Sequence, residues 1–491
     1  MTNFYAQLDA VFAANADRDC LMLPGQPGIS FGAMRDRVAA VGGVLLQQGV
    51  RPGDRVAVQV EKSPENLCLY LATLRIGAVY LPLNTAYTSA ELDYFIGDAE
   101  PALFVGNEGR NDVRSLTLLA DGSGSLMDLA GSAAPAEIAQ CAGTDLAAIL
   151  YTSGTTGRSK GAMLSHDNLA SNAQALSEAW DWQDNDVLLH ALPIFHVHGL
   201  FIASHCALLN GTPMIWLPKF DAKEVAAALP DATVLMGVPT FYVRLLGLPG
   251  FAEQSMAHIR VFICGSAPLT EQVFEEWREA TGHRILERYG MSETIINTSN
   301  PLKGARVPAT VGFPLPKLDL RIADDAGQVV PVGEVGTIEV RGPNVFSGYW
   351  RMPEKTAEEI RADGFFITGD LGTVDSDGRV SIVGRAKDLV ISGGYNVYPK
   401  EVERLIDEIP GVVESAVIGI PHRDFGEGVV AIVVPEGDDV GIETLNSALQ
   451  DQLARFKQPK AVINLSELPR NTMGKVQKNL LRDAYQGLFE E

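Results

Sequence analysis

Cysteine is scarce in this sequence of 491 residues, which has only five, at positions 20, 68, 141, 206 and 264. None of them stands in a Cys-x-x-Cys pair, so their spacing favours neither a disulfide framework nor a zinc site. Scattered, unpaired cysteines are typical of proteins that stay in the reducing cytosol. We therefore expect a cytoplasmic location.

Long apolar runs are also missing. No stretch reaches about 18 uninterrupted apolar residues, the length that predicts a transmembrane helix. The nearest, IFHVHGLFIASHCALL at 194–209, is interrupted by three His and a Gly, and we expect it to form a buried helix beside a site. The N-terminal segment lacks the basic start and apolar core of a signal peptide. We expect no membrane insertion.

Positive charge is in deficit. The chain has 39 Lys and Arg against 61 Asp and Glu, a formal net charge of −22. This argues against nucleic acid and anionic membranes as partners and leaves small-molecule substrates. An acidic protein that binds anions needs a locally positive pocket. Composition does not decide between a monomer and a homodimer.

The most informative segment is YTSGTTGRSKG at 151–161, which follows the apolar run LAAIL. Its glycines let backbone N–H groups curl towards an anion, and its hydroxyls and lysine add donors suited to phosphate. It is not the P-loop of NTPases, because Arg158 follows Gly157 and Gly161 follows Lys160. The predicted phosphate-binding residues are Thr152, Ser153, Gly154, Thr155, Thr156, Gly157 and Lys160.

This string resembles the phosphate-binding signature of acyl-adenylate-forming enzymes, which are the acyl-CoA synthetases, the luciferases and the adenylation domains of peptide synthetases. Four more segments resemble that family's motifs and follow in its order: RYGMSET at 288–294, ITGDLG at 367–372, VGRAKDLVISGGYNVYPKEVE at 383–403 and PRNTMGKVQK at 469–478. The resemblance covers essentially the whole chain. The sequence is identified as a member of that superfamily.

Strand and helix patterns alternate up to about residue 140, and a second alternation runs through the strands at 186–266. Alternation of this kind predicts an α/β fold of mainly parallel sheets covered by helices. Residues 121–143, rich in Gly, Ser and Ala, are expected to be a loose connection. We predict a region 1–384 with a β-rich subdomain at about 310–384, and an α+β domain 385–491 that, by resemblance, is a mobile lid.

The resemblance implies a reaction in two steps. A carboxylate attacks ATP to give acyl-AMP and pyrophosphate, and the acyl group then passes to a thiol, so ATP, Mg²⁺ and coenzyme A are the expected cofactors and co-substrates. Bringing two anions together requires charge neutralisation rather than a protein nucleophile. By resemblance Lys475 is the adenylation lysine, Ser292 donates to the α-phosphate, His196 belongs to the catalytic group, and Glu293 holds Mg²⁺, which prefers hard oxygen ligands.

The remaining nucleotide residues also follow from the resemblance. Tyr289, next to Gly290, would stack on adenine, and Asp370 would accept from the ribose hydroxyls. The further matched positions are Gly265, Ser266 and Ala267 along the adenine, Arg385 as a second nucleotide contact, Lys387 as the hinge of the lid, and Gly393 and Gly394, which would approach the pantetheine arm in a second lid pose.

The sequence gives less direct information on two substrates, the thiol that accepts the acyl group and the carboxylic acid. The chain ends 16 residues after Lys475, which leaves no room for a carrier domain and favours free coenzyme A. The segments expected to line the acid pocket carry charge, and a guanidinium there suits a second carboxylate. The segments FHVHGL at 195–200, VPTFYVRLL at 238–246 and ERYGMSET at 287–294 resemble those of malonyl-CoA and methylmalonyl-CoA synthetases. By that resemblance Arg288 and Ser266 would bind the distal carboxylate, with Arg244 and His198 as second candidates.

Three alternatives stay open. Both arginines could be structural, with Arg244 facing solvent from a helix and Arg288 paired with Glu287 or with phosphate. The enzyme could then be a short- or medium-chain monocarboxylic acyl-CoA synthetase. The chain could also be an inactive nucleotide-binding homologue, but Lys475, Glu293 and Asp370 are all present, which argues against that.

Overall fold

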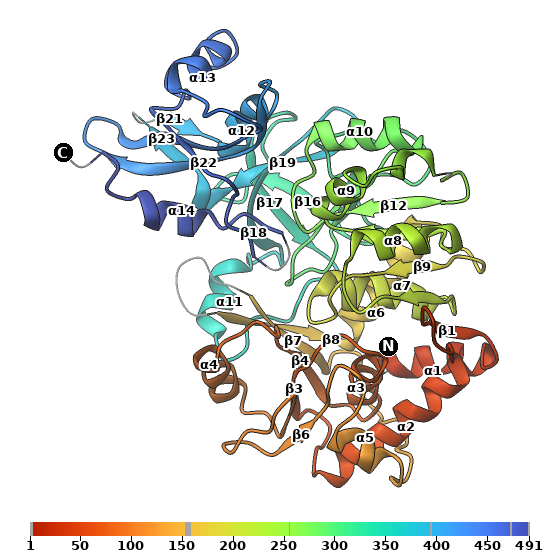
Figure 1. The fold of residues 1–491 in the computed structure, drawn as a ribbon. Helices are drawn as coiled ribbons and strands as arrows, with labels where there is room; N and C mark the ends of the chain where they lie inside the picture. Colours follow the sequence, from red (N-terminus) through yellow and green to blue (C-terminus); the bar gives the residue numbers. More distant parts are fainter. Residues whose placement is uncertain (1–2, 153–158, 255, 393–394, 472–473, 490–491) are drawn as a thin grey trace.

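The computed structural model describes residues 3–152, 159–254, 256–392, 395–471 and 474–489. A large N-terminal region carries a smaller C-terminal domain, the lid, against one side (Figure 1). The expected α/β class, with a large region of mainly parallel sheets and a small C-terminal domain, is confirmed. In the described part of the chain, no helix is long and apolar enough to cross a membrane.

The first sheet has six strands in the order β6-β5-β3-β4-β7-β8, all paired in parallel except β7 with β8. Its two faces are both buried, because Val56 and Val58 face the main core while Ala57 faces a second cluster with Phe95. The strands are β3 (Arg55–Gln59), β4 (Val79–Pro82), β5 (Leu103–Gly106), β6 (Ser115–Thr117), β7 (Leu146–Thr152) and β8 (Lys160–Ser165). The antiparallel strand β8 was not predicted.

The second sheet has nine strands in the order β15-β14-β13-β12-β11-β9-β10-β1-β2, and the six from β13 to β1 run parallel. The strands are β1 (Asp19–Met22), β2 (Ile29–Ser30), β9 (Leu188–His190), β10 (Met214–Trp216), β11 (Val234–Gly237), β12 (Val261–Cys264), β13 (Leu286–Tyr289), β14 (Thr298–Ser299) and β15 (Phe313–Pro314). Parallel strands place all their carboxyl ends at one edge, where open α/β sheets bind ligands.

Helices cover both sheets (Figure 1). They are α1 (Phe4–Ala14), α2 (Phe31–Gln47), α3 (Pro64–Arg75), α4 (Ser89–Ala99), α5 (Ser125–Ala130), α6 (His166–Ala179), α7 (His205–Leu209), α8 (Ala222–Ala228), α9 (Pro239–Leu246) and α10 (Glu271–Thr281), with short 3-10 turns at Leu229–Asp231 and Phe251–Glu253. Helix α6 begins at the predicted cap, since the Ser165 hydroxyl accepts from the Asn168 N–H.

The segment 194–209 is helical and buried, as expected. A π-helix, His198–Ser204, continues directly into α7, and every residue of the π-helix is buried. Single π-helical turns often occur at functional sites. This π-helix begins at His198, which the sequence predicts as a candidate ligand of the acid.

The expectation of a loose connection at 121–143 is wrong for its first part. Residues Ser125–Ala130 form α5, and Leu126 is completely buried in the main core. The Ser125 hydroxyl accepts from the Thr117 N–H at 2.9 Å, which ties the helix to β6. A single buried leucine in a Gly/Ser-rich segment leaves almost no periodic signal in the sequence.

The β-rich subdomain is an antiparallel sheet of β16 (Asp319–Ala323), β17 (Gly336–Arg341), β18 (Phe366–Val374) and β19 (Val380–Arg385), with α11 (Pro353–Glu359) beside it. The lid contains β20 (Val390–Ser392), β21 (Tyr395–Val397), β22 (Val412–His422), β23 (Gly426–Pro435), β24 (Ala461–Asn464), α12 (Pro399–Asp407), α13 (Ile442–Leu449) and α14 (Lys478–Tyr485).

The lid has its own hydrophobic core on both faces of its sheet. Val417 and Val429 pack under α12 and α13, while Ile418 and Val430 pack under α14. The division of the chain after residue 384 stays a prediction. It falls where β19 ends and a short 3-10 turn, Ala386–Asp388, leads to β20.

We predict that Leu126→Ala lowers the free energy of unfolding by about 2–5 kcal/mol, the usual cost of emptying a buried leucine site. Leu119→Ala is the matched control, because Leu119 is 41% exposed. Urea denaturation of both variants measures the difference. Equal stability of the two would show that α5 does not pack as the structure has it.

Candidate active site

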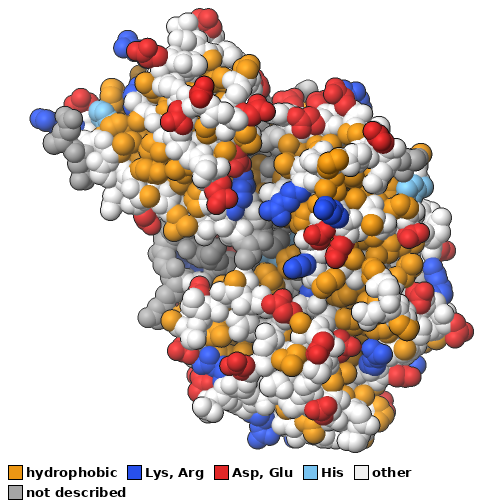
Figure 2. Space-filling view, in the orientation of Figure 1, with side chains coloured by type: hydrophobic (Ala, Val, Ile, Leu, Met, Phe, Trp, Pro, Cys, Tyr) orange, Lys and Arg blue, Asp and Glu red, His pale blue; other side chains and the backbone are white. Residues whose placement is uncertain are grey.

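The carboxyl ends of the parallel strands β11, β12 and β13 face the lid, and the candidate residues gather there. Lys and Arg side chains lie along the hollow between the lid and the larger region, with Asp and Glu side chains among them (Figure 2).

Arg288 is the central cation of the predicted acid pocket. It lies in β13, is 4% exposed, and has two guanidinium nitrogens, Nε and Nη2, that are buried without a hydrogen-bond partner among the described residues. Burial lowers its pKa to about 10, so it stays charged at neutral pH. A side chain on Gly265 would come within 2.6 Å of the guanidinium carbon, so the absence of a Cβ there makes room for Arg288.

Two imidazoles stand beside this guanidinium. His198 shares a hydrogen bond of 3.1 Å between its Nδ1 and the Ser266 hydroxyl, and its Nε2 is buried without a partner among the described residues. Burial, reinforced by Arg288, lowers the pKa of His196 to about 4 and holds the pKa of His198 well below its ordinary value. Both rings are therefore neutral near pH 7 and act as hydrogen-bonding groups.

Arg288 does not pair with Glu287, one of the alternatives left open by the sequence. Successive side chains of a strand point to opposite faces, so Glu287 and Tyr289 face away from Arg288. The Glu287 carboxylate accepts from the Leu269 N–H at 3.4 Å. Burial raises its pKa to about 7.

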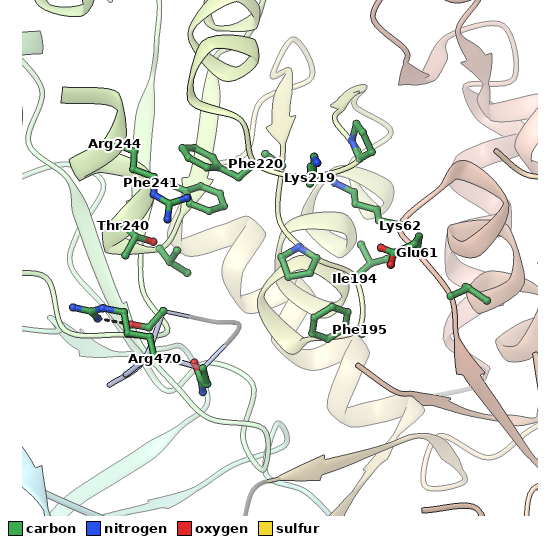
Figure 3. Close-up of a pocket in the computed structure, with 17 residues that line it drawn as sticks. Glu61, Lys62, Ile194, Phe195, Lys219, Phe220, Thr240, Phe241, Arg244 and Arg470 are labelled. Atoms are coloured by element: carbon green, nitrogen blue, oxygen red, sulfur yellow. Dashed lines mark hydrogen bonds between the residues drawn. The ribbon is translucent and has the colours of Figure 1, made fainter. Parts of the chain in front are cut away.

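Arg244 lies in a different hollow. It is exposed on α9 and lines a cavity of about 410 Å³ together with Lys62, Lys219 and the lid residue Arg470. Figure 3 shows Arg244 and Thr240 on one side of this cavity and Lys62 and Lys219 on the other. The remaining lining includes the apolar side chains of Ile194, Phe195, Phe220, Val238 and Phe241. The structure therefore does not bring the two candidate arginines to one anion.

Tyr289, Asp370 and Arg385 form the candidate nucleoside site. The Tyr289 hydroxyl donates to one Asp370 oxygen at 2.5 Å, and the Arg385 Nε lies 2.6 Å from the other. Asp370 and Arg385 are opposite each other in the β18–β19 pair, and therefore their side chains are in contact. Each carboxylate oxygen keeps a further lone pair that can accept from a ribose hydroxyl.

The phosphate loop connects β7 to β8, and Thr152 and Lys160 are paired at the base of this hairpin. The predicted residues Ser153, Gly154, Thr155, Thr156 and Gly157 lie outside the described residues, as do Gly393 and Gly394. The Lys160 ammonium lies 3.0 Å from a Glu359 oxygen and 4.1 Å from the centre of the Tyr349 ring. Neither Glu359 nor Tyr349 was predicted at this site, because neither belongs to a motif of its own.

Glu293 is buried, and one of its oxygens lies 3.0 Å from the Tyr349 hydroxyl, whose single proton is shared between Glu293 and the closer Glu359 oxygen at 2.7 Å. Burial raises its pKa. Among the described residues there is no cluster of three or more His, Cys, Asp or Glu that could enclose a metal ion. One carboxylate close enough to Lys160 for the two charges to interact fits Mg²⁺, which is commonly held by one or two carboxylates and the phosphates of its nucleotide.

The lid brings Lys475 close to Arg385 and Asp370 of the candidate nucleoside site. The Lys475 side chain keeps solvent-accessible area, but the protein atoms around it reduce its hydration, which lowers its pKa. Arg385 lowers this pKa further, whereas Asp370 raises it. A Cβ added to Gly474 of the lid would lie 3.5 Å from the Thr240 side chain of α9, so the two segments are close together. Lys387 lies in the turn that joins β19 to the lid, and burial lowers its pKa to about 8.

Comparison with known proteins agrees with this geometry. The family model "AMP-binding enzyme" matches residues 8–350, and "AMP-binding enzyme C-terminal domain" matches residues 401–475. ATP-bound MatB from Rhodopseudomonas palustris is 53% identical, with 99% of this chain and 100% of that chain covered and a TM-score of 0.95. Apo MatB gives a TM-score of 0.85 at 99% coverage of both chains.

Two curated relatives are equally similar to the chain. "Malonate–CoA ligase ACSF3, mitochondrial" of Mus musculus is 36% identical over 490 residues, covering 89% of this chain and 84% of its own. "Feruloyl-CoA synthase" of an Amycolatopsis species is 36% identical over 467 residues, covering 93% and 94%. The chain belongs to the AMP-binding enzyme family and is an AMP-forming acyl-CoA synthetase that uses ATP, Mg²⁺ and coenzyme A.

Proposed function

We propose that this acyl-CoA synthetase activates malonate, accepts methylmalonate, and forms malonyl-CoA. The observation that carries the proposal is the buried guanidinium of Arg288, which keeps its charge and has two nitrogens without a partner among the described residues. A buried charge without a counter-ion is costly, typically several kcal/mol. A dicarboxylic acid supplies that counter-ion with the carboxylate that does not react.

The neighbours of Arg288 support a carboxylate rather than an apolar chain. His198 and Ser266 are already hydrogen-bonded to each other, and the second nitrogen of His198 is left for the substrate. Ser266 has φ +72°, a backbone conformation that is strained for residues other than glycine and is often found at functional sites. Arg288 and Ser266 are thus the proposed carboxylate ligands, with His198 beside them.

Similarity alone does not select the acid. A malonate–CoA ligase and a feruloyl-CoA synthase match the chain at the same identity. The apolar side chains around the cavity of Arg244 are the observation that favours the second candidate, a short- or medium-chain monocarboxylic acyl-CoA synthetase. In that case an acyl chain would occupy the cavity, and Arg288 would have a structural role.

In the first half-reaction, we assign Lys475 to bridge the attacking carboxylate and the α-phosphate, with Ser292 as a hydroxyl donor to that phosphate. His196 completes the catalytic group as a neutral ring. Glu293 would hold Mg²⁺, which neutralises phosphate charge when bound. The greater likeness to ATP-bound than to apo MatB supports a lid pose suited to adenylation.

In the second half-reaction the lid turns about Lys387. The residue lies in the turn between the last strand of the β-rich subdomain and the first strand of the lid, where a change in a few torsions moves the whole lid. Gly393 and Gly394 would then approach the pantetheine arm.

We predict that malonate has the highest kcat/KM in a panel of mono- and dicarboxylic acids, and that Arg288→Ala lowers this value for malonate more than about 100-fold. Arg244→Ala is the matched control and leaves the order of acids unchanged. The measurement is CoA-thioester formation. A higher kcat/KM for butyrate or octanoate than for malonate would instead establish the monocarboxylic enzyme.

We predict that Lys475→Ala abolishes acyl-AMP formation but leaves ATP binding and CoA transfer from supplied malonyl-AMP largely intact, because its charge is needed only when two anions meet. Acid-dependent exchange of pyrophosphate into ATP measures the first step. Lys460→Ala, another lysine of the lid, serves as the control. Exchange within about tenfold of wild type, only ~1.4 kcal/mol, would contradict the assignment.

We predict that Lys387→Pro retains pyrophosphate exchange but loses thioester formation, because proline fixes φ near −65° and removes the torsional freedom of the hinge. Lys387→Ala keeps that freedom and forms thioester at close to the wild-type rate. The two half-reactions are assayed separately on each variant. A proline variant that performs both would show that the lid turns elsewhere.

A further inference from the structure

A second basic hollow lies at the other end of the strands that carry the active site. It has a volume of about 490 Å³ and is lined by Arg260, Arg278, Gly282, His283, Arg284, Leu302, Gly304 and Arg306. Arg260 directly precedes β12 and Arg284 stands just before β13, so both lie at the amino ends of these strands. The candidate acid and nucleotide residues, among them Arg288 and Tyr289, lie at the carboxyl ends. The hollow is therefore distinct from the active site.

Two of its guanidiniums are held in place by the fold. Arg306 donates from Nε, Nη1 and Nη2 to the carbonyls of Pro301, Arg284 and Leu302 at 3.2, 2.5 and 2.9 Å. Arg260 donates to both Asp186 oxygens and to the Trp180 carbonyl. Each of these bonds uses one of five N–H donors, so both groups keep two donors for a ligand.

Positive charge in the hollow is only partly compensated, because Asp186 pairs with Arg260 from behind while Arg306 has no such partner among the described residues. Its lining holds four arginines and no carboxylate, as far as the described residues go. Arg306 forms no ion pair with any described carboxylate, and burial together with Arg260 and Arg284 lowers its pKa. Arg278 pairs with Glu275 at the surface, an interaction that water weakens. An anion would relieve the repulsion between these guanidiniums.

The rim is open. Gly282 has φ +77°, and a Cβ added to it would meet no atom within 4 Å. A Cβ added to Gly304 would meet only the Pro301 ring, at 3.8 Å. A small ligand can therefore enter between the end of α10 and the loop after β14. Figure 1 places α10 and β12 next to each other on the larger region.

We propose that this hollow is a second anion site that binds a small molecule with two or more phosphate groups. Guanidinium forks match phosphate oxygens in paired hydrogen bonds, and four arginines line this hollow, more than one phosphate needs. The net charge of −22 repels an acidic polypeptide or a nucleic acid over the rest of the surface. A compact anion meets only the local field.

The test is a calorimetric titration of the full-length enzyme with inorganic tripolyphosphate at physiological ionic strength, with the nucleotide site saturated by a non-hydrolysable ATP analogue and Mg²⁺. Wild type is expected to bind one equivalent. Arg284→Ala and Arg278→Ala, both at exposed positions, each raise Kd at least fivefold, and the double variant loses binding. Arg114→Ala makes the same change of charge at an exposed position elsewhere and leaves Kd unchanged.

Binding that is absent in wild type, or equal in Arg284→Ala and wild type, would overturn the proposal. A second arm uses a poly-glutamate peptide and a DNA duplex. Tighter binding of either through the same arginines would also overturn it and identify a macromolecular partner. Malonyl-CoA synthesis by the variants, at saturating substrates, serves as the check that the fold and active site are intact.

Discussion

The pleat of one short strand, β13, separates the two halves of the active site. Arg288 points to one face, towards Gly265 and the two imidazoles, while Tyr289 points to the other and reaches Asp370. Adjacent residues of a strand cannot face the same way. One strand thus carries the proposed acid-binding cation and the proposed nucleotide-binding ring on its two opposite faces.

Burial then decides the charge of each group. The protein carries a net charge of −22, yet the acid pocket holds a guanidinium that stays protonated and histidines that do not. Loss of hydration lowers the pKa of both types of group, but the starting value of arginine is so high that it remains a cation. The pocket therefore has one positive centre with neutral donors around it. This is a suitable environment for one additional carboxylate and an unfavourable one for an apolar chain.

The nucleotide side uses paired charges instead. Arg385 lies on Asp370, and Lys160 lies on Glu359, whose other oxygen accepts from the Tyr349 hydroxyl. These pairs hold the side chains in position. Lys475 comes to this network from the lid, whereas Arg288 belongs to the nine-stranded sheet. The proposed adenylation lysine and the proposed acid-binding arginine therefore lie on different parts of the fold.

Much was decided by the sequence alone, because motifs and periodicity are local. The α/β class, the helix cap at Ser165, the buried segment 194–209 and the acyl-CoA synthetase family all followed from neighbouring residues. Tertiary structure was needed for the rest. Burial of Leu126 makes a helix of a Gly/Ser-rich segment, and the chain path puts Tyr349 and Glu359 beside Lys160 without any motif. The tertiary structure also places Arg244 in a cavity that Arg288 does not line, although both arginines were predicted as possible ligands of one carboxylate. Residue type predicts what a side chain can bind, but solvent exposure and distance, which come only from packing of remote segments, determine whether it does.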